Sequence, residues 1–203
     1  MTRRTVGVVD YGVGNHSSVL QCLQKIGMRC RASDDPTVLG SCEVLLLPGV
    51  GAFRPAMQAL KRKGLDRFLA DWAGHDRPMI GICLGMQLLT EASYEGGFTP
   101  GLGLVPGETV PLGSPRWHIG WNTVTRVTDD PLLDGVNGHS FFFNHAFKYH
   151  GPEQFKLCTT RFEYSFASVI RRRNIIGVQF HPEKSQEIGT GLLGRMIEGL
   201  CRA

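Results

Sequence analysis

Residues 78–91 read PMIGICLGMQLLTE, in which an apolar run passes through a cysteine between two glycines into a run of helix formers. This order predicts a strand at 78–82, a sharp turn, and a helix at 86–91. The turn at 81–85 (GICLG) has the form of a nucleophile elbow in which cysteine replaces serine. Both glycines are expected to be required, because a Cβ at either position of so tight a turn would collide with the neighbouring strand or helix.

The rest of the N-terminal half alternates short apolar runs with amphipathic ones, which is the pattern of a parallel sheet covered by helices. The expected strands are 5–10, 28–32 and 43–47. The last of them is apolar enough to be buried on both faces. Helices are expected at 17–26, with Ser17 as a possible N-cap and Gly27 as the stop, and at 52–72 with a break at Gly64.

The C-terminal half differs in character, because glycine and proline punctuate a series of short strand-like runs. The expected strands lie near 121–127, 140–147, 155–160, 166–170 and 175–180. A last helix is expected to bury the stripe Ile188, Leu192, Met196 and Leu200. We therefore predict one α/β domain over residues 1–203, with a mostly parallel open sheet, helices on both faces and an antiparallel extension.

The charge distribution gives little reason to expect a nucleic-acid partner. The net charge of +4 is small for 203 residues, and acidic and basic residues are interspersed. The one basic run, at 171–174 (RRRN), lies between two apolar runs and predicts an exposed hairpin turn. Binding of a phosphate or of a partner protein is the alternative for this run.

The sequence also predicts a soluble, cytoplasmic protein without a metal site. No apolar stretch reaches the roughly 18 residues of a membrane-spanning helix, and the N-terminus lacks the apolar region and cleavage site of a signal peptide. The six cysteines form no Cys-x-x-Cys pair and have no histidines at metal-ligand spacing. We therefore expect neither a zinc site nor a disulfide framework.

The position of Cys83 before a helix has two electrostatic consequences. The helix dipole and the free N–H groups are expected to lower the pKa of the thiol from about 8.5 toward neutrality. The backbone N–H of Leu84 is expected to point to where a tetrahedral oxyanion would form. The alternative is a structural cysteine packed between two glycines.

His181, Pro182 and Glu183 follow the strand expected at 175–180. Proline ends strand pairing, so His181 is expected at a strand end, where sheets of this class place functional residues. Side chains two residues apart in an extended chain point to the same side, so Glu183 can orient the imidazole while its other nitrogen faces a thiol. Although a histidine at a strand end is often structural, its combination with Cys83 predicts a Cys-His-Glu triad.

Pro48, Gly49, Val50 and Gly51 follow the apolar strand at 43–47. This loop is either a plain strand-to-helix turn or, because its glycines leave the backbone bare, the source of a second N–H for the oxyanion. We favour the second role.

Three motifs together resemble the class I glutamine amidotransferases. They are 48–51 (PGVG), 81–87 (GICLGMQ) and 179–185 (QFHPEKS). Within that family the chain is similar from end to end to the glutaminase subunits of imidazole glycerol phosphate synthases, through 10–15 (DYGVGN) and 118–122 (HIGWN). The resemblance implies hydrolysis of glutamine to glutamate and ammonia, without a cofactor. The ammonia would pass to a separate (β/α)₈-barrel cyclase subunit that makes imidazole glycerol phosphate and aminoimidazole ribotide in histidine biosynthesis.

The resemblance also implies a role for each matching residue. Cys83 would attack the side-chain amide of L-glutamine, and His181, oriented by Glu183, would protonate the departing ammonia and then activate water. Gln87 would help to hold the substrate. The residues that would face the barrel or the ammonia passage are Asn15, Trp121, Phe142 and Lys184.

Two segments depart from the pattern of the synthase subunits. Those subunits usually carry a tyrosine-rich strand ending in Val-His-Ser/Thr-Tyr where this chain has 141–147 (FFFNHAF). The chain therefore departs from the pattern at Asn144, Ala146 and Phe147, and hydroxyls that would contact glutamine or the passage are missing. Trp117 stands where proline normally precedes the histidine. An alternative ammonia acceptor is therefore an acetamido sugar, which a similar branch of subunits is thought to convert to an acetamidino sugar for surface polysaccharides.

Two other classes of function remain open. A stand-alone cysteine hydrolase would share the elbow and need no partner, but Gln87 and the partner-facing residues argue against it. A non-catalytic binding subunit would keep the fold, but the intact Cys83, His181 and Glu183 argue against that.

Overall fold

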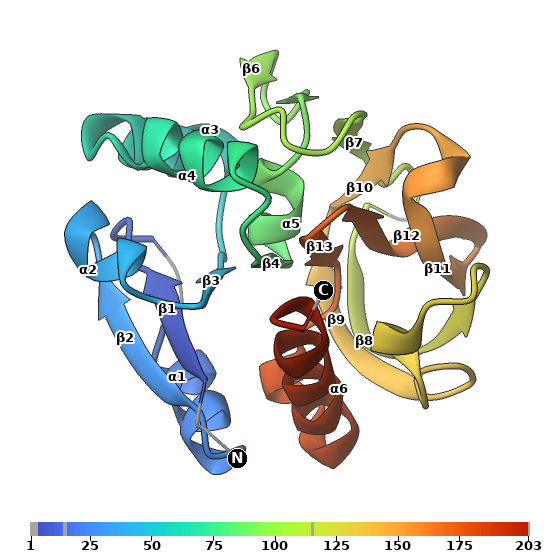
Figure 1. Cartoon of the computed structure of the whole chain (residues 1–203). Helices are drawn as coiled ribbons and strands as arrows, with labels where there is room; N and C mark the ends of the chain where they lie inside the picture. The colour runs from blue at the N-terminus through green and yellow to red at the C-terminus, as the bar shows by residue number, and fades with distance from the viewer. Residues whose placement is uncertain (1–3, 14–15, 115, 203) are drawn as a thin grey trace.

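The computed structural model describes residues 4–13, 16–114 and 116–202. The parallel half of its larger sheet consists, in spatial order, of β2 (Arg29–Ser33), β1 (Thr5–Val9), β3 (Val44–Leu47), β4 (Met79–Ile82) and β13 (Ile175–Val178). An antiparallel half continues through β12 (Tyr164–Arg172), β11 (Lys156–Phe162), β8 (His118–Arg126) and β9 (Ser140–His145). Within the described residues this nine-stranded sheet (Figure 1) confirms the predicted parallel sheet with an antiparallel extension.

Helices cover both faces of the parallel half, as predicted (Figure 1). One face carries α1 (His16–Lys25) and α6 (Gln186–Leu200), and the other carries α3 (Phe53–Arg62), α4 (Leu65–Gly74) and α5 (Leu84–Leu88). All four residues of β3 are buried, with alternate side chains in the two cores. The apolar run is therefore buried on both faces, as its composition predicts.

The antiparallel half curls back toward the middle of the sheet. Although β9 is the last strand in the order, the carbonyl of Phe142 in β9 accepts a hydrogen bond from the backbone N–H of His181, just after β13, at 2.8 Å. The rings of Phe141 and Phe180 stack beside this contact, with centroids 4.3 Å apart. The curl brings the residues that follow β9 to the carboxyl ends of β4 and β13.

A second, four-stranded sheet was not predicted. It consists of β10 (Phe147–His150), β7 (Glu108–Pro111), β5 (Ala92–Ser93) and β6 (Thr99–Pro100) in that spatial order. The single strand expected at 140–147 is wrong, because the chain leaves the larger sheet at Ala146 and enters this one. At the break, the ring of His145 bonds to the carbonyl of Phe147 at 2.8 Å, which bends the backbone away from the straight path of one strand.

Helix boundaries also differ from those expected. α1 begins at His16, so Ser17 lies inside it and is not its N-cap. α5 starts directly at Leu84 and ends at Leu88, because Thr90 donates its hydroxyl to the carbonyl of Gln87 at 2.7 Å and residue 91 already bonds to the second sheet. The remaining helical segments are the unpredicted α2 (Pro36–Gly40) and the 3₁₀ turns η1 (Pro131–Leu133), η2 (Glu153–Phe155) and η3 (Pro182–Lys184).

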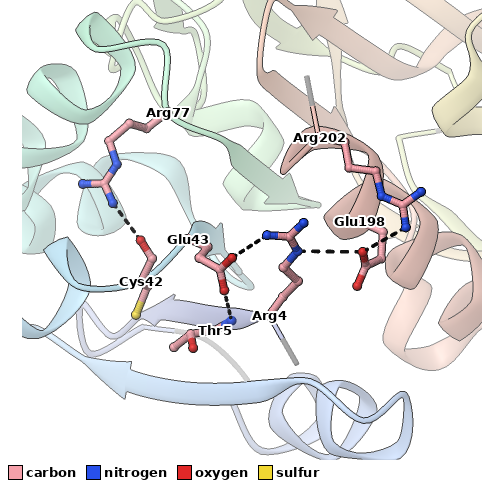
Figure 2. Close-up of polar contacts among 7 residues, drawn as sticks. All are labelled: Arg4, Thr5, Cys42, Glu43, Arg77, Glu198 and Arg202. Atoms are coloured by element: carbon pink, nitrogen blue, oxygen red, sulfur yellow. Dashed lines mark hydrogen bonds and ion pairs between the residues drawn. The ribbon is translucent and has the colours of Figure 1, made fainter. Parts of the chain in front are cut away.

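Ion pairs tie together the amino ends of the parallel strands and the last turn of α6 (Figure 2). Arg4 lies 2.6 Å from the carboxylate of Glu43, which also accepts the backbone N–H of Thr5 at 2.8 Å. Arg4 also faces Glu198 of α6 at 3.8 Å, and Arg202 meets the same carboxylate at 3.4 Å. These pairs are partly exposed, so they contribute little each. They lie at the end of the sheet away from Cys83, which follows the carboxyl end of β4.

The arginine run forms the predicted hairpin. Residues 173 and 174 make the turn between β12 and β13, with Arg172 opposite Ile175. Arg171 pairs with Asp130 at 2.5 Å, and Arg172 donates to the carbonyl of Leu104 at 3.1 Å. Two of the arginines are thus engaged within the chain. Separately, no helix among the described residues has the length and apolarity needed to cross a membrane.

Candidate active site

Cys83 lies at a strained turn between β4 and α5. Its backbone has φ 53° and ψ −108°, a conformation that L-residues rarely adopt. Its N–H donates to the carbonyl of Val178 in β13 at 2.8 Å, which fixes the turn against the neighbouring strand. The thiol sulfur lies 3.6 Å from the carbonyl oxygen of Asn144. The elbow geometry predicted from the sequence is therefore present.

The glycines on either side of Cys83 are required by close backbone contacts. A Cβ on Gly81 would lie 2.8 Å from the carbonyl carbon of Gly85. A Cβ on Gly85 would lie 1.8 Å from the carbonyl oxygen of Leu47 in β3. The predicted collisions with helix and strand are both found.

His181 and Glu183 meet as expected for a base and the group that orients it. The imidazole Nδ1 lies 2.8 Å from Oε1 of Glu183, and both side chains are almost fully buried. The hydroxyl of Ser185 donates to the His181 carbonyl at 2.6 Å, which holds the backbone of the base in place.

The Cys83 thiol and Glu183 set the protonation of His181. Burial alone would lower the pKa of His181. The negative charge and hydrogen bonding of a Cys83 thiolate, together with the hydrogen bond and charge of Glu183, outweigh burial and raise this pKa to about 10. The imidazole beside the thiol can therefore carry the proton that a histidine gives to the leaving group after a cysteine has attacked a carbonyl.

A cavity of about 420 Å³ opens onto the thiol, a size suited to a small-molecule ligand. Its lining residues are Val50, Gly51, Ala52, Cys83, Leu84, Gln87, Glu95, Trp117, Asn144, His145, Ala146, Phe147 and His181. The four positions that depart from the synthase pattern, at 117, 144, 146 and 147, thus all line this cavity.

The loop at 48–51 divides into two parts. Gly49 lies under the turn, where a Cβ would meet the Tyr11 hydroxyl at 2.7 Å and the Cβ of Leu84 at 2.8 Å. Val50 and Gly51, the latter with φ 100°, face the cavity. Close packing therefore requires glycine at 49, whereas oxyanion donation by this loop, Gly49 included, and by Leu84 stays a prediction.

Gln87 is predicted to hold substrate, and its amide already has partners in the protein. It donates to the carbonyl of Phe147 and to Oε1 of Gln179, both at 3.3 Å. Gln179, which sequence reasoning missed, lies with its amide nitrogen 3.9 Å from the Cys83 sulfur. Its signal was its position two residues before His181 at a strand end, which places both side chains on one side.

Glu95 is a second cavity residue that sequence reasoning missed. It lies between the two-residue strands β5 and β6, where no periodicity marks it. Its carboxylate accepts the backbone N–H of Phe53 at 2.7 Å and supplies a negative charge to the cavity wall.

Three of the predicted partner-facing residues, Trp121, Phe142 and Lys184, are not among those that line the cavity. Trp121 is about half exposed and touches Phe142 edge to face, with ring centroids 6.2 Å apart. Phe142 in turn lies 6.5 Å from the His181 ring, and Lys184 ends η3. Asn15 lies outside the described residues. No group of three or more His, Cys, Asp or Glu in the described part of the chain is placed to hold a metal ion.

Because the ring of His145 is buried, we expect the protein to be less stable in mild acid. Burial lowers its pKa from 6.5 to about 4, a shift to which His118 and His181 also contribute. Between these values the unfolded chain binds a proton that the folded chain excludes, so the free energy of unfolding should fall as the pH falls, by at most about 3 kcal/mol. Urea unfolding at pH 7.5, 5.5 and 4.5 measures this. The free energy of unfolding should depend less steeply on pH in His145→Gln than in the wild type. An equally steep dependence in this variant would show that His145 is not its cause.

Comparison with known proteins agrees with this geometry. The chain matches the family described as glutamine amidotransferase class-I over residues 7–194. It is 44% identical over 197 residues to the "Imidazole glycerol phosphate synthase subunit HisH" of Symbiobacterium thermophilum, which covers 94% of this chain and 93% of that one. The protein of the same name from Geobacillus thermodenitrificans is 40% identical over 201 residues, covering 95% of this chain and 94% of that one.

Solved structures show the same fold at low sequence identity. "Structure of PurLQS from Thermotoga maritima" aligns with a TM-score of 0.78 and 19% identity over 98% of this chain and 100% of that one. A glutamine amidotransferase from Thermotoga maritima aligns with a TM-score of 0.74 and 14% identity over 100% of both chains. The family match spans residues 7–194, and the relative from Symbiobacterium thermophilum is 44% identical over 94% of the chain. This chain therefore belongs to the class I glutamine amidotransferase family.

Proposed function

We propose that the chain is the glutaminase subunit of an imidazole glycerol phosphate synthase, with Cys83, His181 and Glu183 as its catalytic triad. The observation that carries the proposal is a thiol at a strained elbow, beside a buried His-Glu pair, at the wall of a cavity of about 420 Å³. The names of the relatives, which are 38–44% identical, support the same assignment.

The chemistry follows from the triad. The Cys83 thiolate attacks the amide carbon of glutamine, and the oxyanion that forms is held by the N–H of Leu84 and one from the loop at 49–51. His181 as imidazolium protonates the leaving nitrogen, releasing ammonia and a thioester. The same ring then takes a proton from water, which cleaves the thioester to glutamate and restores the thiolate. Glu183 keeps the ring in the required orientation.

The cavity also offers contacts for the rest of the substrate. The Glu95 carboxylate provides a counter-charge for an α-ammonium group, and the amide of Gln87 provides a polar contact in the same cavity. A substrate with an amide at one end and a charged amine at the other fits this arrangement better than a plain ester does.

We further propose that the ammonia passes to a (β/α)₈-barrel cyclase subunit that docks near Trp121, Phe142 and Lys184. Ammonia released into water is protonated and no longer nucleophilic, so a shielded route to the acceptor is needed. The word "subunit" in the names of the relatives supports a partner. The rest of those names, imidazole glycerol phosphate synthase, favours the histidine pathway over the acetamido-sugar acceptor.

Covalent labelling with a glutamine analogue tests the triad directly. A diazoketone analogue of glutamine, 6-diazo-5-oxo-L-norleucine, should alkylate Cys83, and excess L-glutamine should protect it. Mass spectrometry of the digested protein locates the label. Cys30→Ala, which removes a thiol in β2 far from the cavity, is the matched control and should label as the wild type does. Labelling elsewhere, or labelling that glutamine does not suppress, would refute the proposal.

Ammonia release distinguishes the competing functions. The isolated chain should turn over glutamine weakly, and a barrel subunit with its ligand should stimulate it strongly. Vigorous turnover of a non-glutamine amide or ester without any partner would favour the stand-alone hydrolase. No turnover and no labelling of Cys83 under any condition would favour a binding subunit.

A further inference from the structure

Two buried histidines beside the cavity belong to no step of the proposed reaction. His118 in β8 and His145 in β9 are directly opposite in the strand pairing, and their side chains are buried. Nδ1 of His118 lies 3.0 Å from Nε2 of His145. Buried polar groups are unfavourable unless they are bonded, so the partners of the four ring nitrogens decide what this pair does.

The partners at the two ends fix the tautomer of each ring. The carbonyl oxygen of Phe147 only accepts, so Nδ1 of His145, at 2.8 Å, must carry a proton. At the other end, the amide nitrogen of Asn122 lies 3.1 Å from Nε2 of His118 and only donates, so this ring nitrogen must accept. The Asn122 amide cannot be reversed, because its oxygen accepts the N–H of Thr123 at 2.7 Å.

With both ends fixed, the middle bond has one direction. Nδ1–H of His118 donates to Nε2 of His145, and both rings are neutral. Burial lowers the pKa of both rings, and the titratable groups that act on His145, which are His118 and His181, disfavour its protonation further. Aromatic rings enclose the pair, with Phe162 stacked 4.2 Å from His118 and Phe166 5.0 Å from His145.

The chain of hydrogen bonds continues from the pair to the thiol. The Phe147 carbonyl that accepts from His145 also accepts from the amide of Gln87 at 3.3 Å. Gln87 bonds to Gln179, whose amide nitrogen lies 3.9 Å from the Cys83 sulfur. Since His145, Phe147 and Gln87 line the cavity, the position of the pair sets the position of the part of the cavity wall that Phe147 and Gln87 form.

We propose that His118 and His145 form a neutral positioning pair that holds the Phe147 carbonyl, and through it Gln87, in the geometry that binds glutamine. The inference rests on the proposed glutaminase function. Neither ring touches the reacting atoms, so both are positioning residues.

His118→Phe tests the pair by kinetics. Phenylalanine keeps the stacking on Phe162 and removes the donor to His145. We expect KM for glutamine to rise about tenfold, the factor that corresponds to loss of one buried hydrogen bond, with kcat reduced less than threefold. His118→Asn, whose amide N–H can stand in for Nδ1–H, should restore KM to within about threefold of wild type.

A variant that loosens only the packing separates positioning from structure. Phe162→Leu removes the stacking on His118 but leaves the bonds, so it should lower Tm and leave KM near the wild-type value. If His118→Phe lowers Tm without changing KM, or if Phe162→Leu raises KM as much, the pair is structural and the proposal is wrong.

The wild-type protein gives a second readout that needs no variant to fold. In ¹⁵N-histidine-labelled protein at pH 7.5, both rings should show a protonated Nδ1 and an unprotonated Nε2. A charged ring or an Nε2–H tautomer in either residue would overturn the proposal. If the wild type lacks glutaminase activity, the proposed function fails, and this spectrum still decides the state of the pair.

Discussion

Cys83→Ala is expected to fold as the wild type does and to lose glutamine hydrolysis by a factor of at least about 10⁴. Alanine removes the only atom that can form the thioester, and His181 alone cannot replace it. The strained backbone at φ 53° is no worse for alanine than for cysteine, since both carry a Cβ. Glutamate release in the presence of the barrel partner measures the loss, and thermal unfolding checks that the fold is intact.

Cys30→Ala controls for thiol removal as such. Cys30 lies in β2, which is separated from β4 by β1 and β3. The Cys30→Ala variant should therefore hydrolyse glutamine as fast as the wild type does. Turnover retained by Cys83→Ala would show that the nucleophile is another group. Loss of turnover in both variants would point to a general effect on folding.

Gly85→Ala should have the largest effect on the structure. Its Cβ would lie 1.8 Å from the carbonyl oxygen of Leu47, and both groups belong to backbone that must shift for the methyl to fit. We expect the free energy of unfolding to fall by about 3 kcal/mol or more. Any shift of α5 also moves Leu84 and Gln87, so turnover should fall by about 10² or more. Urea unfolding and glutamate release measure the two effects.

A glycine with room for a methyl provides the matched control. Gly194 lies inside α6, where an added Cβ would have its nearest neighbour, the Ile26 side chain, at an ordinary 3.7 Å. Gly194→Ala should leave activity unchanged and stabilise the fold by up to about 1 kcal/mol, because alanine favours the helix. If Gly85→Ala and Gly194→Ala had the same effects, the requirement for glycine at 85 could not be attributed to the close packing of α5 on β3.

The elements that sequence reasoning found are those with strong local signals. The strand at 44–47 is apolar throughout, and the glycines around Cys83 mark a turn that no other residue type fits. His181 and Glu183 were predicted to meet because an extended chain places side chains two apart on one side. They do meet, at 2.8 Å, but the 3₁₀ turn η3 that starts at Pro182 brings them together, so the expected extended backbone is wrong here. That these two residues lie near Cys83 was inferred from the chemistry of a triad. In the structure β4 pairs with β13, so the residues that follow the two strands lie side by side.

The features that sequence reasoning missed depend on contacts between distant segments. β5 and β6 have two residues each, too few to show a period, so Glu95 between them carried no signal. The run at 141–147 (FFFNHAF) contains no glycine or proline, so nothing in it marked the break at Ala146. That break coincides with a bond between the His145 ring and the backbone carbonyl of Phe147, and with the pairing of β10 to β7. Gln179 joined the site because the pairing of β13 with β4 brings it beside Gln87 and the Cys83 sulfur.

The adjacency of β4 and β13 has a consequence for the chain while it is being synthesised. Cys83 leaves the ribosome long before His181 has been translated, and β13 must still insert between β4 and β12 before the imidazole can reach the sulfur. Until then the growing polypeptide carries an ordinary sulfhydryl. Its reactivity toward electrophiles, and its ability to consume the cell's glutamine, are therefore switched on only when the last part of the sequence is in place.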